Sequence, residues 1–307
     1  MSQYHTPVLL DESVSALITN TQGIYADATF GGGGHTAAIL SRLHASGKVI
    51  AFDRDMDAIE ASPIRDSRLT LIHNNFRFIE NYARQLGVQF DGVLADLGVS
   101  SHQFDTPERG FSFRFDAPLD MRMNTAASRT AADLLNDETP ARLEQILRLY
   151  GEVDGAGRMA RLIADARAKE PIRTSGQLDA AIASMLPRGA EHKVLAKVYQ
   201  ALRIEVNQEM RSLEKFLDGA VRSLRPGGRL VVITYHSLED RMVKNFIKCG
   251  NVAGEEEKDL YGRPLSPLEA VGRKPILPAE EEIAANTRAR SAKLRVAEKK
   301  KKEEERT

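Results

Sequence analysis

The sequence contains one cysteine, Cys249, among 307 residues. A single thiol cannot form a disulfide within the chain, and it excludes zinc sites that are built from several cysteines. The seven histidines do not show the HExxH spacing of a helical zinc site. We therefore expect no structural metal ion.

Long hydrophobic runs are also missing. No stretch approaches the roughly 18 consecutive apolar residues of a membrane-spanning helix. The first residues, MSQYHTPVLLDE, lack the basic and apolar regions of a secretory signal. The hydrophobic fraction of 42% and the charged fraction of 28% are typical of a folded globular protein. We therefore expect a protein of the cytoplasm.

The chain has no net charge, which does not favour a nucleic-acid partner, but its charges are unevenly distributed. Residues 255–282 are acidic. Eight basic residues follow them: Arg288, Arg290, Lys293, Arg295, Lys299, Lys300, Lys301 and Lys302. Taken alone, the lysines at 299–302 are typical of a solvated tail, and contact with RNA phosphates is the alternative.

The chain predicts an α/β fold. Buried strands are expected at 23–30, 48–55, 68–76 and 90–98, with helix-length segments between them, which indicates a parallel sheet with right-handed crossovers. A fifth strand, at 229–237, follows a turn signal at 225–228. A helix is expected at 237–248, and an alternating edge strand at 291–299.

About 130 residues separate the fourth and fifth strands, which is too long for an ordinary crossover. Apolar residues recur there at helical spacing after Thr139 and Pro140, again from Met159, and again after a possible helix cap at Ser175. We predict a helical subdomain at 108–205, inserted into a core formed by 1–107 and 206–307.

Ligands of open parallel sheets bind beyond the carboxyl ends of the strands. The first strand is followed by four glycines at 31–34 and by His35, a loop that lets the backbone approach a ligand closely. Asp53 ends the second strand, where a carboxylate can accept hydrogen bonds from both ribose hydroxyls. A flexible turn and a helix-capping acid are the alternatives. Together, the loop and the acid indicate a cofactor that contains adenosine.

Two adenosine cofactors fit this pattern. The segment 32–37 satisfies the loose dinucleotide motif GxGxxA, so an NAD-dependent oxidoreductase is one reading. Asp27, before the loop, and Asp96, at the end of the fourth strand, favour S-adenosylmethionine, because carboxylates attract its sulfonium and amino groups and repel a pyrophosphate. An RNA-binding module without catalytic activity is a third reading.

Seven blocks resemble the ribosomal RNA small subunit methyltransferase H family: HTPVLLDE (5–12), DATFGGGGH (27–35), DLGVSS (96–101), RGFSF (109–113), PLDMRM (118–123), YHSLEDR (235–241) and NTRARSAKLR (286–295). The resemblance implies a Rossmann-like class I methyltransferase core with a mostly parallel seven-stranded sheet. It implies transfer of a methyl group from S-adenosyl-L-methionine to N4 of a P-site cytidine, position 1402, in 16S ribosomal RNA of the small subunit. The cofactor positions it implies are Gly33, Gly34, His35, Asp53, Phe76, Asp96 and Gln103.

Further residues are candidates for the chemistry. Asp96, Asp120 and His236 are the catalytic candidates, since an acceptor must hold the N–H groups of a weakly nucleophilic amine. The four residues at 96–99 (DLGV) depart from the motif of DNA amino-methyltransferases, so this assignment rests on residue type alone. Arg109, Phe111, Phe113, Arg114 and Arg122 interleave cations with aromatic rings, as single-strand binders do, and a hinge is the alternative.

Cys249 bears on which atom is methylated. Carbon 5 of a pyrimidine becomes nucleophilic only after a thiolate adds to the ring. Cys249 lies near the end of a predicted helix and not after a strand, so we expect it to be a small buried or semi-exposed residue and the target atom to be nitrogen. The sequence leaves open whether the protein forms a homodimer.

Overall fold

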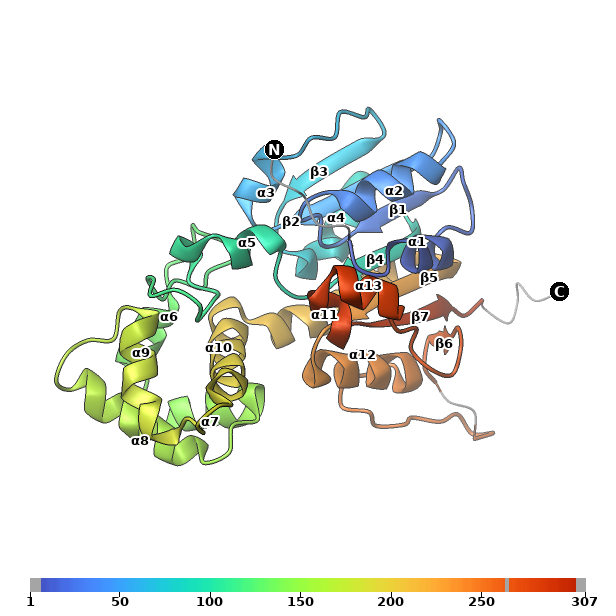
Figure 1. Cartoon of the computed structure of the whole chain (residues 1–307). Coiled ribbons are helices and arrows are strands. Elements are labelled where there is room, and N and C mark those ends of the chain that lie inside the picture. Colours follow the sequence, from blue (N-terminus) through green and yellow to red (C-terminus); the bar gives the residue numbers. More distant parts are fainter. Residues whose placement is uncertain (1–6, 263–264, 302–307) are drawn as a thin grey trace. The chain divides into compact units, whose positions relative to one another are not determined.

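A computed structural model describes residues 7–262 and 265–301 of the chain. It divides into two compact units: Met1–Gly98 together with Met210–Thr307, and Val99–Glu209 (Figure 1). The predicted insertion at 108–205 lies inside the second unit, which begins nine residues earlier and ends four residues later in the sequence. It starts earlier because Val99 and Phe104 pack against the core of the helices.

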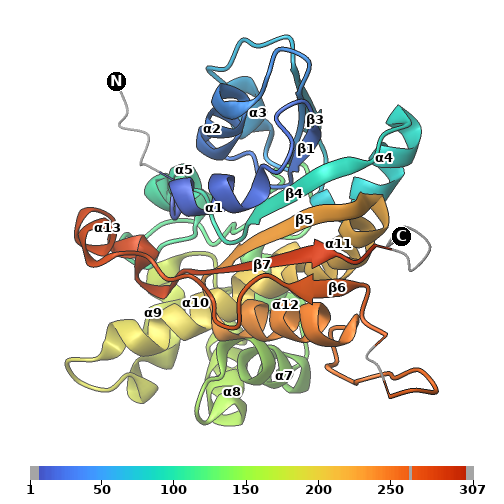
Figure 2. The same ribbon diagram turned by 90° about the vertical axis from the view of Figure 1, so that its right-hand side faces the viewer.

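The first unit is built on a seven-stranded sheet with the order β3-β2-β1-β4-β5-β7-β6. The strands are β1 (Ile24–Asp27), β2 (Lys48–Asp53), β3 (Leu69–His73), β4 (Phe90–Asp96), β5 (Leu224–Thr234), β6 (Leu268–Ala270) and β7 (Lys293–Lys299). The five strands from β3 to β5 are parallel, and β7 and β6 add antiparallel strands. Figure 2 shows β4, β5, β7 and β6 side by side in this order. The predicted α/β sheet is confirmed.

Two details of the strand prediction are wrong. The last strand, β7, is not at the edge of the sheet, because it pairs with β5 on one side and with β6 on the other. The turn signal at 225–228 lies inside β5, where pairing with β4 shifts from Phe90–Leu224 to Gly92–Arg229. The four residues therefore form a bulge within a continuous strand, with Gly227 at a φ of +77°.

Helices cover both faces of the sheet. On one face, α1 (Leu10–Leu17) and α2 (Gly34–Arg42) pack against Leu94 of β4 and Val231 of β5. On the other face, α4 (Ile79–Leu86), α11 (Glu209–Ser223) and α12 (Ser237–Cys249) pack against Val93 and Val232. Neighbouring residues of one strand thus enter opposite cores, which explains why these strands are continuously apolar. Shorter helices are α3 (Met56–Glu60) and α13 (Glu280–Ala285).

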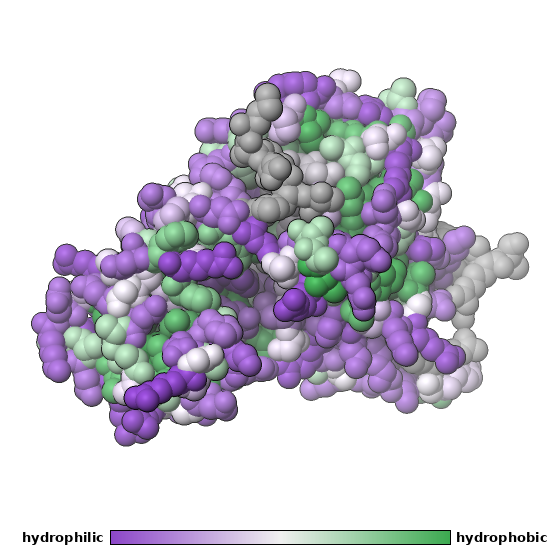
Figure 3. All heavy atoms as spheres, in the orientation of Figure 1, coloured by the Kyte–Doolittle hydropathy of each residue, from purple (hydrophilic) through white to green (hydrophobic). Residues whose placement is uncertain are grey.

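The second unit is helical, with α5 (Ser101–Asp105), α6 (Ala131–Asp137), α7 (Pro140–Gly151), α8 (Ala156–Arg167), α9 (Ser175–Ile182) and α10 (Glu191–Asn207). Thr139 caps α7 as predicted, through its side chain and the N–H of Arg142. The predicted cap at Ser175 is wrong: Thr174 caps α9, and the Ser175 hydroxyl donates to the carbonyl of Phe115. Figure 3 shows hydrophobic side chains gathered over the region of α9 and α10.

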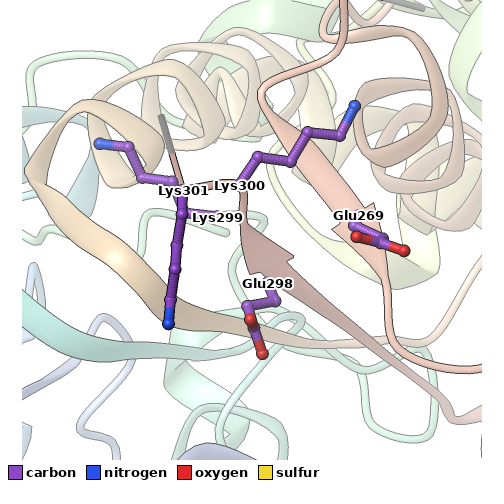
Figure 4. Close-up of a pocket in the computed structure, with 5 residues that line it drawn as sticks. All are labelled: Glu269, Glu298, Lys299, Lys300 and Lys301. Atoms are coloured by element: carbon purple, nitrogen blue, oxygen red, sulfur yellow. The ribbon is translucent and has the colours of Figure 1, made fainter. Parts of the chain in front are cut away.

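The basic C-terminal segment is more ordered than a solvated tail. Lys293 and Arg295 of β7 form ion pairs with Asp240, and the Lys299 ammonium donates to the carbonyl of Leu224. Lys300 and Lys301 line a small hollow with Lys299, Glu269 and Glu298. The three lysine side chains point in different directions there (Figure 4), so they do not converge on one anion. Lys302 lies outside the described residues.

Cys249 is the last residue of α12 and is buried, as predicted. Gly250 follows at a φ of +79° and ends the helix in the left-handed conformation. Within 7–262 and 265–301, no helix is long and apolar enough to cross a membrane.

Candidate cofactor site

The topology of the first unit directs attention to the edge between β1 and β4. From β1 the chain builds β2 and β3 on one side, and β4 and β5 lie on the other side. The connections that leave the carboxyl ends of β1 and β4 therefore diverge, and a ligand can enter between them. The glycine loop follows β1, and Asp96 is the last residue of β4.

The glycine loop has a backbone that other residues could not adopt without strain. Gly31 and Gly33 have φ values of +51° and +78°. A Cβ atom at Gly33 would lie 2.9 Å from the ring of Phe30, and one at Gly34 would lie 2.2 Å from Cγ of Pro7. Gly33 precedes α2 as its N-cap residue, and no side chain caps that helix among the described residues. The first amide groups of α2 therefore face the same edge as the loop.

Asp27 holds the loop to the helix that follows it. This fully buried carboxylate accepts hydrogen bonds from the hydroxyl of Thr36, at 2.7 Å, and from the N–H of Thr29, at 3.1 Å. Burial raises its pKa, and the nearby His35 and the hydrogen bond from Thr36 oppose this. Asp27 thus fixes the loop from within the fold, and its charge contributes to the field at the edge.

Asp53 connects the end of β2 to the glycine loop. One carboxylate oxygen accepts the N–H of Gly31 at 2.7 Å, and the other accepts the N–H of Asp55 at 2.8 Å. Burial raises the pKa of Asp53, and these two hydrogen bonds oppose it. Each carboxylate oxygen has a second acceptor site, so Asp53 can still receive hydrogen bonds from a diol.

Asp96 is held on three sides. One oxygen accepts the Tyr235 hydroxyl at 2.7 Å, the other lies 3.7 Å from Nδ1 of His35, and the backbone N–H donates to the hydroxyl of Thr29 at 2.7 Å. Burial raises the pKa of Asp96 to about 6, against the opposing effects of His35 and Tyr235, while the charges of Asp27 and Glu239 raise it further. Asp96 is therefore a carboxylate near the midpoint of its titration at mildly acidic pH.

His35 is the second residue of α2 and is 4% exposed. It does not cap this helix, because Gly33 occupies the N-cap position. Its Nε2 atom has no hydrogen-bond partner among the described residues, although it is buried. A buried polar nitrogen without a partner is costly, so this atom is a candidate to bind a ligand.

Phe76 starts a short 3-10 helix, Phe76–Phe78, soon after β3. Its ring lies edge-to-face with Phe216 of α11, with 5.0 Å between the ring centres, and it packs on the rim of the core. The side chain is half-buried, so part of the ring is accessible. This fits the predicted place at the end of a strand and leaves a face for a planar ligand.

His236 does not have the geometry of a catalytic residue. It caps α12: its Nδ1 accepts the N–H of Glu239 at 3.4 Å, and its Nε2 lies 3.1 Å from the Glu239 carboxylate. Glu239 in turn accepts the N–H of Tyr235 at 2.9 Å. Nδ1 of His236 thus caps the first turn of the helix, which gives this residue a structural role. Its Nε2 atom lies close to Glu239 but makes no hydrogen bond within the described residues.

Gln103 and Asp120 belong to the helical unit. Gln103 is not a surface loop residue, because it is buried and its side chain completes a capping box with Ser100 at the start of α5. Asp120 accepts two hydrogen bonds from the guanidinium group of Arg122, at 2.8 and 2.6 Å. A third Arg122 nitrogen donates to the carbonyl of Ala127. The predicted acid and the predicted RNA-binding arginine are thus partners of one another.

The segment that interleaves arginines and aromatic rings is mostly internal. Arg109 is 8% exposed and donates to the carbonyls of Arg122 and Met123, and Phe111 is buried in the core of the unit. Both side chains are thus used to fold the segment, and their contact with RNA stays a prediction. Phe113 is half-buried against Tyr199, and Arg114 is exposed.

Three residues that hold the site were missed as candidates: Tyr235, Thr29 and Thr36. Tyr235 and Thr29 lie within two residues of a strand end, and Thr36 lies in α2. Each forms a hydrogen bond with one of the predicted acids. The sequence signal was available for Tyr235, since it directly follows β5, the neighbour of β4.

A family model described as the MraW methylase family matches residues 2–300. The chain belongs to this family. A relative from Phocaeicola vulgatus, named ribosomal RNA small subunit methyltransferase H, is 52% identical over 297 residues, which cover 96% of this chain and 97% of the relative. A relative of the same name from Bacteroides thetaiotaomicron is 53% identical and covers 97% and 98%. A solved rRNA methylase from Streptococcus thermophilus is 14% identical, with a TM-score of 0.40 over 95% of this chain and 93% of that chain.

Five of the cofactor positions that the resemblance implies lie at one edge of the sheet in the first unit: Gly33, Gly34, His35, Asp53 and Asp96. Phe76 follows β3 at the same edge.

Proposed function

We propose that this protein transfers a methyl group from S-adenosyl-L-methionine to N4 of cytidine 1402 of 16S ribosomal RNA, in the small ribosomal subunit. We propose the cytoplasm as its location. The names of the relatives support the substrate and the reaction. The set of carboxylates around the glycine loop, from Asp27, Asp53 and Asp96, is the observation that supports S-adenosyl-L-methionine as the cofactor. Such a set attracts a sulfonium and an ammonium group and disfavours the pyrophosphate of NAD.

Each residue of the edge has a use in holding this cofactor. Asp53 receives the ribose hydroxyls, since its oxygens retain acceptor sites beside the N–H groups of Gly31 and Asp55. The accessible part of the Phe76 ring covers the adenine. The unpartnered Nε2 of His35 takes a polar group of the methionine part. Gln103, which belongs to the helical unit, stays a cofactor position that the resemblance implies.

The cofactor supplies an electrophilic methyl group, and the protein must orient an amine that is a poor nucleophile. The N4 nitrogen must be held with its lone pair towards the methyl group, and the proton that the amine loses passes to solvent water. Asp96 is the residue that we assign to hold the N–H groups, because its carboxylate lies at the divergent edge and its position is fixed by Tyr235 and Thr29.

Asp120 and His236 are not assigned a catalytic role. The carboxylate of Asp120 is bound by Arg122, and both nitrogens of His236 face the first turn of α12. Removal of either side chain is expected to act through folding.

The helical unit is proposed to recognise the ribosomal RNA. Arg114 and Phe115 are neighbours in sequence and both are exposed, Phe115 to 55%, which offers one cation for a phosphate and one ring for an unstacked base. An enzyme that acts on a base must take it out of its stack, so such a ring has a clear use.

Methyl transfer to purified small subunits tests this function. The protein is incubated with radiolabelled S-adenosyl-L-methionine and small subunits from cells that lack it, and the RNA is digested to nucleosides. We expect label in N4-methylcytidine. Label in another nucleoside, or none, would contradict the proposal. Titration calorimetry with S-adenosyl-L-methionine and with NAD separates the two cofactors, and binding of NAD alone would indicate an oxidoreductase.

A further inference from the structure

Tyr235 occupies a distinctive position beside the proposed site. It directly follows β5, and its hydroxyl donates to Asp96, at the end of the neighbouring strand β4, over 2.7 Å. The two residues are 139 positions apart in the sequence, so the sheet alone brings them together. The bond from the Asp96 N–H to the Thr29 hydroxyl is equally short, at 2.7 Å. The third contact of Asp96, with Nδ1 of His35, is longer, at 3.7 Å.

The tyrosine is fixed from two directions. Its backbone N–H donates to the Glu239 carboxylate at 2.9 Å, which ties it to the start of α12. Its ring lies against Gly98, where a Cβ atom would come within 3.2 Å of Cδ2 and where φ is +112°. A glycine is therefore required opposite the ring. The hydroxyl has little freedom to leave Asp96.

The charges near the pair make this hydrogen bond matter. The groups that face Asp96 and Tyr235 are His35 of α2, Asp27 of β1, Glu239 of α12 and Glu282 of α13. Three of these four are acids, and both burial and the charges of Asp27 and Glu239 oppose ionisation of Asp96. Burial and the neighbouring Asp96 also raise the pKa of Tyr235 well above its ordinary value, so the tyrosine stays a neutral donor at physiological pH.

We propose that Tyr235 is a positioning residue for methyl transfer: it keeps Asp96 ionised and fixes one of its oxygens, so that the other oxygen is presented to the cationic cofactor or the target amine. This inference rests on the proposed function. It adds a role for a residue outside the set of cofactor and catalytic positions described above.

Tyr235→Phe removes the hydroxyl and keeps the ring against Gly98. A hydrogen bond to a charged group stabilises it by an amount that corresponds to about one pKa unit or more. The affinity for S-adenosyl-L-methionine, measured by calorimetry between pH 5 and 8.5, should fall on the acidic side of its pH profile. We expect this fall, the acidic limb, to move up by about one pH unit. The acidic limb of kcat in the methylation assay should move in the same direction.

Tyr25→Phe is the matched control. Its hydroxyl also is buried, but it donates to Asn20 and accepts from the amides of Thr19 and Asn20, at the other end of the sheet. This variant is expected to lower Tm without moving either limb. An unmoved limb in a folded Tyr235→Phe protein, or an equal movement in Tyr25→Phe, would overturn the inference.

A second substitution keeps the test decisive if Tyr235→Phe does not fold. Genetically encoded 3-fluorotyrosine at position 235 keeps the ring and makes the hydroxyl a stronger donor, so the acidic limb should move to lower pH. An unchanged limb would contradict the inference. If the unaltered protein neither binds S-adenosyl-L-methionine nor methylates small subunits, the proposed function fails instead, and the two failures are thus distinguished.

Discussion

Replacing Asp96 by asparagine should make the protein more stable and less able to bind its cofactor. The ionised carboxylate is disfavoured in the folded state, since burial raises its pKa from 3.8 to about 6. A raised folded-state pKa contributes stability that is fully present below the unfolded value and is lost as the pH rises through about 6. Asparagine carries no charge, so the variant avoids this loss.

The structure sets the size of the effect. The difference between 3.8 and about 6 corresponds to roughly 3 kcal/mol at most. The Asp96 side chain is 23% exposed, so water screens part of the cost, and a gain of about 1 to 2 kcal/mol is expected above pH 7. This gain corresponds to a rise in Tm of about 2 to 5 °C. The affinity for S-adenosyl-L-methionine should fall about tenfold or more.

Thermal unfolding of the unliganded protein at pH 8 and pH 5, together with calorimetry at pH 8, checks these signs. The gain in Tm should be largest at pH 8 and should shrink towards pH 5. Asp91→Asn is a control on the same strand, because Asp91 accepts the N–H of Ile24 at 2.7 Å and pairs with Arg225, and its loss should lower Tm. A lower Tm for Asp96→Asn at pH 8, or a gain that does not depend on pH, would show that ionised Asp96 does not destabilise the fold.

Three further outcomes are expected. Asp53→Ala should weaken S-adenosyl-L-methionine binding about tenfold or more; unchanged affinity in a folded variant would remove Asp53 from the site. Cys249→Ala should keep full activity and yield N4-methylcytidine, and a 5-methyl product would contradict transfer to nitrogen. Deletion of 301–307, which leaves β7 intact, should not change cofactor affinity. If the tail binds RNA, the deletion should flatten the salt dependence of subunit binding by roughly 0.7 to 0.9 per lost phosphate contact. An unaltered slope would indicate that the tail is a solvated segment.

A deletion that begins at residue 297 would not be an equivalent test. Residues 297–299 belong to β7, and Ala297 pairs with both Leu230 and Ala270. A deletion that starts there would cut a strand in the middle of the sheet, and any loss of RNA binding would then reflect unfolding.

The parallel strands could be predicted from the sequence because each one is buried on both faces and so reads as an apolar run. The edge strand β6 could not, since it has three residues and two of them, Glu269 and Ala270, are exposed. The inner position of β7 follows from pairing with β5 and β6, which no local pattern contains.

The site was partly predictable for a related reason. Asp53 and Asp96 end strands, and a strand end in a parallel sheet has a known place in the fold. The roles of Arg109 and His236 could not be foreseen, because they depend on partners that the tertiary structure supplies: the carbonyls of Arg122 and Met123 for one, and the first turn of α12 for the other. The bond between Tyr235 and Asp96 has the same origin.

Mass mapping of 16S ribosomal RNA from cells that lack this protein, compared with the same cells after its gene is restored, tests whether cytidine 1402 is the target. We expect that one methyl group, on N4 of cytidine 1402, is absent without the protein and returns with it, and that it does not return with Asp96→Asn. A fragment around cytidine 1402 that has the same mass in both strains would show that the protein does not methylate this nucleotide.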